Sequence, residues 1–324
     1  MNTDNKMKTF KISAPAKFIL FGEHAVVYGY PAIAVPVLDV RAYARLVLDD
    51  TIYEPYVEAQ DLNIRAPVTM TDYPSEIKHI MDALKLVPSF GGFKLPERGW
   101  RLSIQSDIPI SRGLGSSAAI SVALVKALYY FSSASLSSHE LIDISYELEK
   151  YHHGTPSGID NTVISLERPV LFQRGKDIQP LDSRLFYFVI GDTGIGKSTA
   201  RVVAEVARRH EIDRTKYRNL FEAIGKISRK GLQCLSEGDK YGLGQLMNDN
   251  QKFLQEIGVS SVELENLITT ALDNGAIGAK LCGAGQGGCM VCVADDEHSA
   301  NSIAVALKKN GAVQSFVSRL LVGN

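Results

Sequence analysis

Short apolar runs of strand length alternate with longer stretches of helical periodicity along the whole chain. The apolar runs predict strands at residues 10–13, 17–21, 32–37, 42–48, 101–104, 185–190, 277–281, 289–294 and 313–321. Apolar residues that recur every three to four positions predict helices at 76–86, 120–131, 138–153 and 299–310, and a mostly helical region over 196–274. Strands and helices therefore mix throughout the chain.

Composition narrows the class of protein. The 324 residues are enough for roughly two domains, at about 150 residues each. Hydrophobic residues make up 45% and charged residues 22%, which excludes general disorder. The 35 Lys and Arg residues nearly balance the 36 Asp and Glu residues, so the net charge is −1. This balance argues against a strongly basic nucleic-acid-binding protein.

The sequence also predicts the location of the protein in the cell and its division into domains. It contains no run of 18 apolar residues, and its first eight residues are polar, so we expect neither a membrane span nor a signal peptide. The cysteines at 234, 282, 289 and 292 predict neither a disulfide framework nor a zinc site. We expect a soluble cytoplasmic protein, with domains of residues 1–180 and 181–324.

A glycine-serine segment, Gly113-Leu-Gly-Ser-Ser117, precedes the predicted helix at 120–131. Glycines let a backbone approach a ligand closely, and a helix N-terminus offers N–H groups and partial positive charge to a phosphate. The serine hydroxyls can cap the helix, bind phosphate or ligate Mg²⁺. An ordinary Gly-Ser turn with a serine cap is an equal alternative for this segment alone.

Two further segments match nucleotide-binding patterns. Residues 283–288 (GAGQGG) fit G-x-G-x-x-G, but a predicted strand follows where a dinucleotide-binding fold needs a helix. Such a glycine-rich hairpin indicates close approach to a ligand or to another loop. Residues 191–198 (GDTGIGKS) fit the P-loop pattern, in which Lys197 would contact phosphates and Ser198 would contact Mg²⁺. The mostly helical region that follows weakens this interpretation, which stays open as an alternative.

Two acidic residues are candidates for chemistry, although neither stands out alone. Glu149 falls late in the predicted helix at 138–153, where a solvated charge is the ordinary interpretation. Asp160 follows the turn-forming residues Thr155-Pro-Ser-Gly158, where an Asp is often a helix cap.

Three motifs together carry a family resemblance. Residues 14–29 (APAKFILFGEHAVVYG), 109–119 (PISRGLGSSAA) and 280–289 (KLCGAGQGGC) resemble, in this order, the signature motifs of the GHMP small-molecule kinases. The GEHAVVYG version of the first motif and residues 153–160 (HGTPSGID) resemble the mevalonate-phosphorylating branch of that family. The resemblance spans about residues 10–320.

The resemblance implies a fold and an activity. The fold is α+β with two domains, the first like ribosomal protein S5 domain 2 and the second ferredoxin-like. The activity is ATP-dependent phosphorylation of the 5-hydroxyl of mevalonate with Mg²⁺. The implied partner is this small molecule, with no nucleic acid and no membrane, and the protein is expected to be a homodimer.

The resemblance also implies roles for individual residues. Asp160 is the expected catalytic carboxylate, with Lys17 as its cationic partner, and Ser117 and Glu149 are the expected Mg²⁺ ligands. The residues expected to bind ATP are Pro109, Gly113, Leu114, Gly115, Ser116, Ser117, Ala118, Gly283 and Gly285. The residues expected to bind mevalonate are Lys17, Glu23, His24, Ser157, Asp160 and Thr193.

Some residues depart from the family pattern. Arg112, Cys282 and Gln286 stand where a small residue, Thr and Gly are common. Residues 192–199 resemble a family segment that opens the second domain, so the P-loop match is expected to be a coincidence and Lys197 dispensable. The alternatives of the same fold are a phosphomevalonate kinase, another GHMP sugar kinase, a mevalonate 3-kinase or a diphosphomevalonate decarboxylase. The others are a P-loop NTPase that uses Lys197 and a non-catalytic relative.

Overall fold

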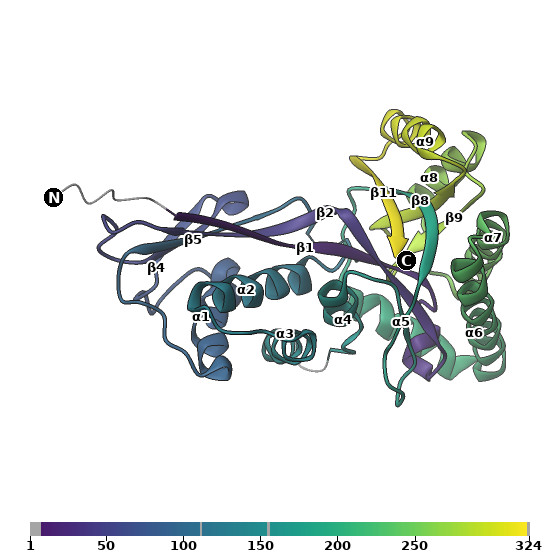
Figure 1. Cartoon of the computed structure of the whole chain (residues 1–324). Helices are drawn as coiled ribbons and strands as arrows, with labels where there is room; N and C mark the ends of the chain where they lie inside the picture. Colours follow the sequence, from purple (N-terminus) through teal and green to yellow (C-terminus); the bar gives the residue numbers. More distant parts are fainter. Residues whose placement is uncertain (1–7, 111, 154–155, 323–324) are drawn as a thin grey trace. The chain divides into compact units, whose positions relative to one another are not determined.

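The computed structural model describes residues 8–110, 112–153 and 156–322, which form two compact units (Figure 1). Unit 1 consists of the described residues up to Pro15, Arg41–Ile108 and Ser116–Leu166. Unit 2 consists of Ala16–Val40, Pro109–Gly115 and the described residues from Glu167 onward. The single boundary expected between residues 180 and 181 stays a prediction.

Unit 1 combines a sheet with four α-helices. Its strands are β3 (Tyr56–Ala59), β4 (Ile64–Pro67), β5 (Trp100–Ser106) and the second part of β2 (Ala32–Leu48), which pairs antiparallel with β5. β1 (Lys8–Phe21) pairs with β2. The helices are α1 (Lys78–Gly91), α2 (Ser116–Ser132), α3 (Ser138–His153) and α4 (Ile159–Leu166), and short 3₁₀ turns lie at Gln60–Leu62 and Ser75–Ile77. α2 is buried along most of its length and packs against the other three helices.

Unit 2 is built on a four-stranded antiparallel sheet. Its strands are β8 (Ser183–Asp192), β9 (Gly278–Cys282), β10 (Cys289–Ala294) and β11 (Gln314–Val322), in the order β11-β8-β10-β9. Numbered within this sheet the order is 4-1-3-2, which confirms the ferredoxin-like expectation. Every residue of β9 and β10 is buried, so both faces of these strands are covered.

Five helices of unit 2 pack around this sheet: α5 (Thr199–Ile212), α6 (Arg214–Glu237), α7 (Lys240–Ile257), α8 (Val262–Asp273) and α9 (Glu297–Lys309). The unit also contains the 3₁₀ helix η1 (Ala25–Tyr28) and the short strands β6 (Val170–Phe172) and β7 (Gln179–Pro180). β6 pairs with β2 through Ala32–Ala34. Among the described residues, no helix combines the length and apolar character needed to cross a bilayer.

The structure differs from the expected elements in several places, and α4, β6 and β7 have no counterpart among the expected elements. The predicted strands 32–37 and 42–48 are one strand, β2, and the Asp39 carboxylate between them accepts from the backbone N–H of Arg319 at 3.0 Å. Residues 10–13 and 17–21 are likewise one strand, β1. The polar stretch 51–99 contains β3 and β4, which are only four residues long and give too weak a pattern to predict.

A glycine contact between α7 and β9 generates a stability prediction. A Cβ at Gly278 would lie 2.0 Å from the backbone oxygen of Gly244. Because backbone atoms cannot yield as a flexible side chain can, we expect Gly278→Ala to lower the free energy of unfolding by about 3 kcal/mol. Urea unfolding followed by circular dichroism measures the loss. The exposed Gln245→Ala on α7 is the control, and equal stabilities of the two variants would contradict the contact.

Candidate active site

The first motif forms a tight turn between β1 and η1 in unit 2. Gly22 has φ +105° and a Cβ there would lie 2.5 Å from Ala32, so only glycine fits. The chain then turns through His24 at φ 59°, an uncommon conformation for a residue other than glycine. The turn carries the side chains of Glu23 and His24 inward, where they are 3% and 6% exposed.

Glu23 forms an ion pair with Lys280, which lies on β9 just before the third motif's glycines. The two side chains are 1% and 0% exposed. Lys280 Nζ also donates to the carbonyl of Leu281 at 2.6 Å, and Asn250 donates to the second carboxylate oxygen of Glu23 at 3.3 Å. Burial raises the pKa of Glu23, and the charge and hydrogen bond of Lys280 oppose this shift. The pair therefore fixes the first motif to the third.

His24 makes a second link between the same motifs. Its Nε2–H donates to the carbonyl of Ala284 at 2.9 Å, which fixes the tautomer because a carbonyl only accepts. Burial lowers the pKa of His24, so the neutral imidazole is favoured.

The third motif is a loop held from both sides. The N–H of Gln286 donates to the carbonyl of Val259 at 2.6 Å, and a Cβ at Gly285 would lie 2.2 Å from that same oxygen. The hydroxyl of Thr193 donates to the carbonyl of Gly288 at 2.8 Å. Thr193, expected along the mevalonate cleft, thus has its hydroxyl bonded to this loop.

The second motif's loop lies beside the third. A Cβ at Gly113 or at Gly283 would come within 3.6 Å of the other residue's Cα, so two stretches of bare backbone face each other. The N–H of Lys17 donates to the carbonyl of Leu114 at 2.9 Å, and the Lys17 side chain is buried. The glycines therefore serve close approach between loops, one of the two alternatives that the sequence left open.

Arg112, a departure from the family pattern, connects the second loop to the end of β8. Its Nε lies 3.2 Å from Oδ1 of Asp192, and its Nη2 donates to the carbonyl of Gly194 at 2.7 Å. Asp192 also accepts from the N–H of Gly194 at 2.8 Å. The side chains of Asp192 and Thr193 and the backbone of Gly194, in the P-loop-like segment, are therefore engaged in holding the two glycine loops.

Unit 1 brings the expected Mg²⁺ ligands together. The hydroxyls of Ser117 and Ser121, on α2, both donate to Oε1 of Glu149, on α3, at 2.9 Å. Nε2 of His79, on α1, lies 2.7 Å from the Ser121 oxygen. Because the Ser121 proton goes to Glu149, His79 is the donor in this contact. The Glu149 carboxylate is buried, so the solvated-charge interpretation is wrong.

These residues fit a magnesium ion that also binds phosphate. Mg²⁺ takes oxygen ligands and is usually held by one or two carboxylates together with substrate phosphates. Ser117 and Glu149 supply one hydroxyl and one carboxylate close together. Among the described residues, no group of three or more His, Cys, Asp and Glu side chains could hold a metal without such help.

Asp160 is the second residue of α4 and partly buried. A helix N-terminus favours a negatively charged carboxylate at this position. Ser157 lies just before the helix and its hydroxyl accepts from the N–H of Ile159 at 3.4 Å. Residues 154 and 155 of the same motif lie outside the described residues. The pairing of Asp160 with Lys17 stays a prediction, because the two residues belong to different units.

The remaining expected ATP-binding residues follow one another along the chain. Pro109 and Leu114 belong to the loop segment Pro109–Gly115 of unit 2, and Ser116 and Ala118 open α2 in unit 1. Ser116 begins the helix rather than capping it.

Sequence reasoning gave no role to Lys280, Asn250, Ser121 or His79. Lys280 has a visible signal, since it is the one charged residue in a strand that is otherwise apolar. A lysine buried in such a strand needs an anionic partner. The other three lie in ordinary helices, and nothing in their spacing marks them.

Cys289 and Cys292 have C-x-x-C spacing, but they lie three positions apart on the strand β10 and so face opposite sides of the sheet. All four cysteines are free thiols, and burial raises the pKa of Cys282 and Cys292 to about 12.

Comparisons with known proteins agree with these motifs. The N-terminal domain of GHMP kinases matches residues 77–168, and the C-terminal domain of GHMP kinases matches residues 221–313. A mevalonate kinase of Pyrococcus horikoshii is 36% identical over 93% of this chain and 92% of its own length. The crystal structure of L. major mevalonate kinase in complex with R-mevalonate has a TM-score of 0.85 at 29% identity, covering 99% of this chain and 98% of that one. A Streptococcus pneumoniae phosphomevalonate kinase has a TM-score of 0.76 at 18% identity over 96% of this chain and 100% of its own, a likeness of fold alone.

The ion pair of Glu23 and Lys280 generates a double-mutant prediction. Glu23→Gln leaves a buried lysine charge without its partner, and Lys280→Met leaves a buried carboxylate, so each lowers the free energy of unfolding by about 3–5 kcal/mol. The double variant should lose clearly less than the two losses added. Urea unfolding measures this coupling. The exposed pair of Asp249 and Lys252 is the matched control, with a coupling below about 1 kcal/mol. Additive losses at Glu23 and Lys280 would show that the pair does not interact.

The pKa of His24 generates a pH prediction. Because burial lowers this pKa below 6.5 in the folded state, the unfolded chain binds the proton more readily between the two values. Stability should therefore fall as the pH drops below about 6.5, by up to ~1.4 kcal/mol per pH unit. His24→Gln keeps a donor for Ala284 and should flatten this slope, measured by urea unfolding between pH 7 and 5. The exposed His298→Gln should leave the slope as in the wild type, and a slope unchanged in His24→Gln would contradict the assignment.

Proposed function

The chain belongs to the mevalonate kinase family of the GHMP kinases, and we propose that it transfers the γ-phosphoryl group of ATP to the 5-hydroxyl group of mevalonate. The main support for the proposal is that the chain is similar to mevalonate kinases over nearly its full length and also carries all three motifs. Unit 2 gathers the motif loops through the contacts of Glu23, His24 and Arg112, and unit 1 joins Ser117 to Glu149.

Asp160 is the residue that we assign to the substrate hydroxyl. Phosphoryl transfer needs a positioned nucleophile and neutralised charge more than covalent help. A carboxylate at the start of α4 can orient the 5-hydroxyl and accept its proton. Lys17 is its proposed cationic partner, which would keep the carboxylate ionised and polarise the hydroxyl.

ATP is the co-substrate, and we propose that the segment from Pro109 to Ala118 holds its phosphates with Gly283 and Gly285. The loop leads directly into α2, whose first N–H groups suit phosphate oxygens. Ser117 and Glu149 would hold Mg²⁺, which neutralises charge on the phosphates during transfer. Ser121 and His79 orient the Glu149 carboxylate for this task.

Mevalonate is the proposed acceptor, with Ser157, Thr193 and His24 along its site. Glu23 has a different part in this proposal, because its carboxylate is already bound to Lys280 and enclosed. We assign Glu23 to holding the third loop in place rather than to contact with the substrate.

The other candidate functions have less support. A P-loop needs its lysine after a strand of a mostly parallel sheet, whereas β8 pairs antiparallel with both β10 and β11. Lys197 donates to the side chain of Gln286 at 3.3 Å. A phosphomevalonate kinase resembles the chain in fold alone. A homodimer in the cytoplasm remains part of the proposal, and light scattering on the purified protein measures the oligomeric state.

A product assay tests the reaction. The purified protein is incubated with Mg-ATP and R-mevalonate, and ³¹P NMR identifies the product. We expect the 5-phosphate, and we expect Asp160→Asn to lower kcat about 100-fold or more because the proton acceptor is lost. The exposed Asp143→Asn and the P-loop test Lys197→Ala should both leave kcat nearly unchanged.

Each other outcome identifies an alternative. A 3-phosphate would keep the fold and change the acceptor, and no phosphorylated mevalonate would overturn the proposal. Loss of turnover in Lys197→Ala with full activity in Asp160→Asn would favour the P-loop NTPase.

A further inference from the structure

A basic pocket of about 500 Å³ lies along one side of α5 in unit 2. Its lining residues are Arg201, Ala204, Glu205, Arg208, Arg209 and Gln286. Five of them belong to α5, and positions 201, 204, 205 and 208 follow the i, i+3, i+4, i+7 spacing that puts side chains on one helix face. Three guanidinium groups against one carboxylate leave the lining with a net charge of +2.

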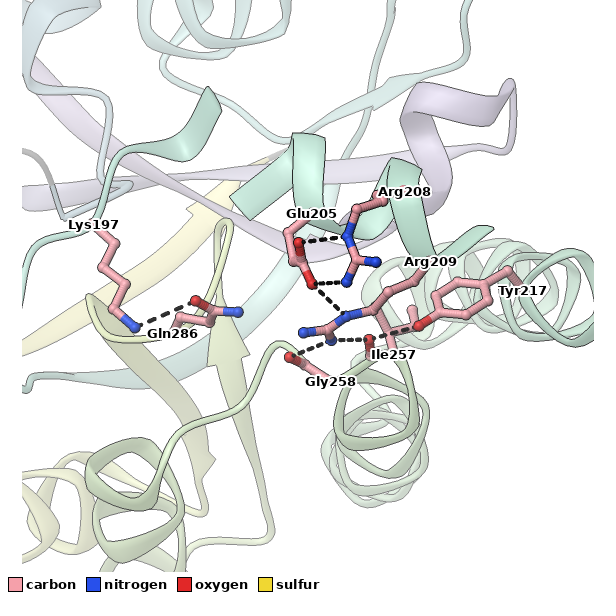
Figure 2. Close-up of polar contacts among 8 residues, drawn as sticks. All are labelled: Lys197, Glu205, Arg208, Arg209, Tyr217, Ile257, Gly258 and Gln286. Atoms are coloured by element: carbon pink, nitrogen blue, oxygen red, sulfur yellow. Dashed lines mark hydrogen bonds and ion pairs between the residues drawn. The ribbon is translucent and has the colours of Figure 1, made fainter. Parts of the chain in front are cut away.

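The three arginines are held to different degrees. Arg209 donates to Oε1 of Glu205 at 3.0 Å and to the carbonyls of Ile257 and Gly258, both at 3.1 Å. These carbonyls end α7, where the helix dipole favours a cation. These contacts, drawn in Figure 2, hold the Arg209 side chain in place at one side of the pocket.

Arg208 and Arg201 are the arginines that can reach a ligand. Arg208 uses Nε and Nη2 for Glu205, at 3.1 and 2.9 Å, and its Nη1 takes no part in that pair. The hydrogen bond from Arg208 lowers the pKa of Glu205 to about 2, so the carboxylate stays charged and keeps its pairing with Arg208. Arg201 is exposed at the other end of the same face. The two Cα atoms are about 10 Å apart, from a rise of ~1.5 Å per residue, so both long side chains can converge on one ligand.

The pocket borders the third glycine loop. Gln286 stands at φ 56° in that loop, its N–H is bonded to Val259, and its side chain accepts from Lys197. Val259 directly follows Gly258, whose carbonyl is bonded to Arg209. Gln286 therefore connects one side of the pocket to the third loop. A glycine in place of Gln286 would leave that side of the pocket without a side chain.

We propose that this pocket binds a small polyanion, a molecule that carries a diphosphate or several carboxylates, between Arg201 and Arg208. Planar guanidinium groups bind both anions in a bidentate manner. Two arginines beside one carboxylate suit a ligand with two or more negative charges. None of the lining residues is one that we assign to ATP or mevalonate, and occupancy of the pocket would be transmitted to the third loop through Gln286.

Calorimetric titration tests the site. Inorganic pyrophosphate and citrate are added in separate titrations, with the reaction site first saturated by a non-hydrolysable ATP analogue, Mg²⁺ and mevalonate. We expect at least one probe to bind the wild type, with Kd at least tenfold weaker in Arg201→Gln/Arg208→Gln. Glu205→Gln should bind about threefold or more tightly, because a negative charge leaves the pocket.

The matched control is Arg214→Gln, which removes an arginine paired with Glu211 on the surface outside the pocket. It should bind like the wild type, and circular dichroism checks that every variant is folded. If only pyrophosphate binds, the ligand is a phosphorylated molecule. If only citrate binds, the ligand is a polycarboxylate. If both bind, the site selects its ligand by negative charge. The proposal is overturned if neither probe binds the wild type at millimolar concentration, or if the double variant binds the probe as tightly as the Arg214→Gln control does. Because the readout is binding, it is independent of whether mevalonate is phosphorylated.

Discussion

The buried ion pair between Glu23 and Lys280 is the contact on which the loop arrangement of unit 2 depends. Removing two charges from water is unfavourable unless each finds the other in good geometry, with further hydrogen bonds for the remaining atoms. Asn250 and the carbonyl of Leu281 supply those bonds. The pair can therefore form only when the turn after β1 reaches the end of β9, and this requirement selects one arrangement of the two motifs.

The other loop contacts build on that arrangement. Once the third loop is fixed at Lys280, His24 reaches the carbonyl of Ala284, and Gly113 can face Gly283 backbone to backbone. Arg112 then ties the second loop to Asp192 at the end of β8. Charged and polar side chains thus position loops whose own glycines have little conformational preference. A phosphate-binding backbone has to be held in place before a ligand arrives, because ordering it later would reduce affinity.

Much of this could be predicted from the sequence, and the side-chain partners that were missed share one physical cause. The helices and the longer strands follow local periodicity, and the glycine loops follow local composition, so both are visible in one sequence. The partners of Lys280, Arg112 and Glu149 are 257, 80 and 28 or 32 positions away. Nothing local in the chain encodes such a pairing. The helix pattern alone therefore indicates a surface charge at Glu149, although Ser117 and Ser121 on another helix bond to it, and only the family resemblance paired it with Ser117.

The P-loop-like segment shows how context decides the meaning of a motif. The P-loop pattern requires glycines whose backbone surrounds a phosphate. Here the carbonyl of Gly194 accepts from Arg112 and its N–H donates to Asp192. A Cβ at Gly194 would also lie 2.7 Å from Val313, so its glycine is required by packing. Lys197 meets Gln286 instead of a phosphate. The same residue types in the same order therefore perform a structural task.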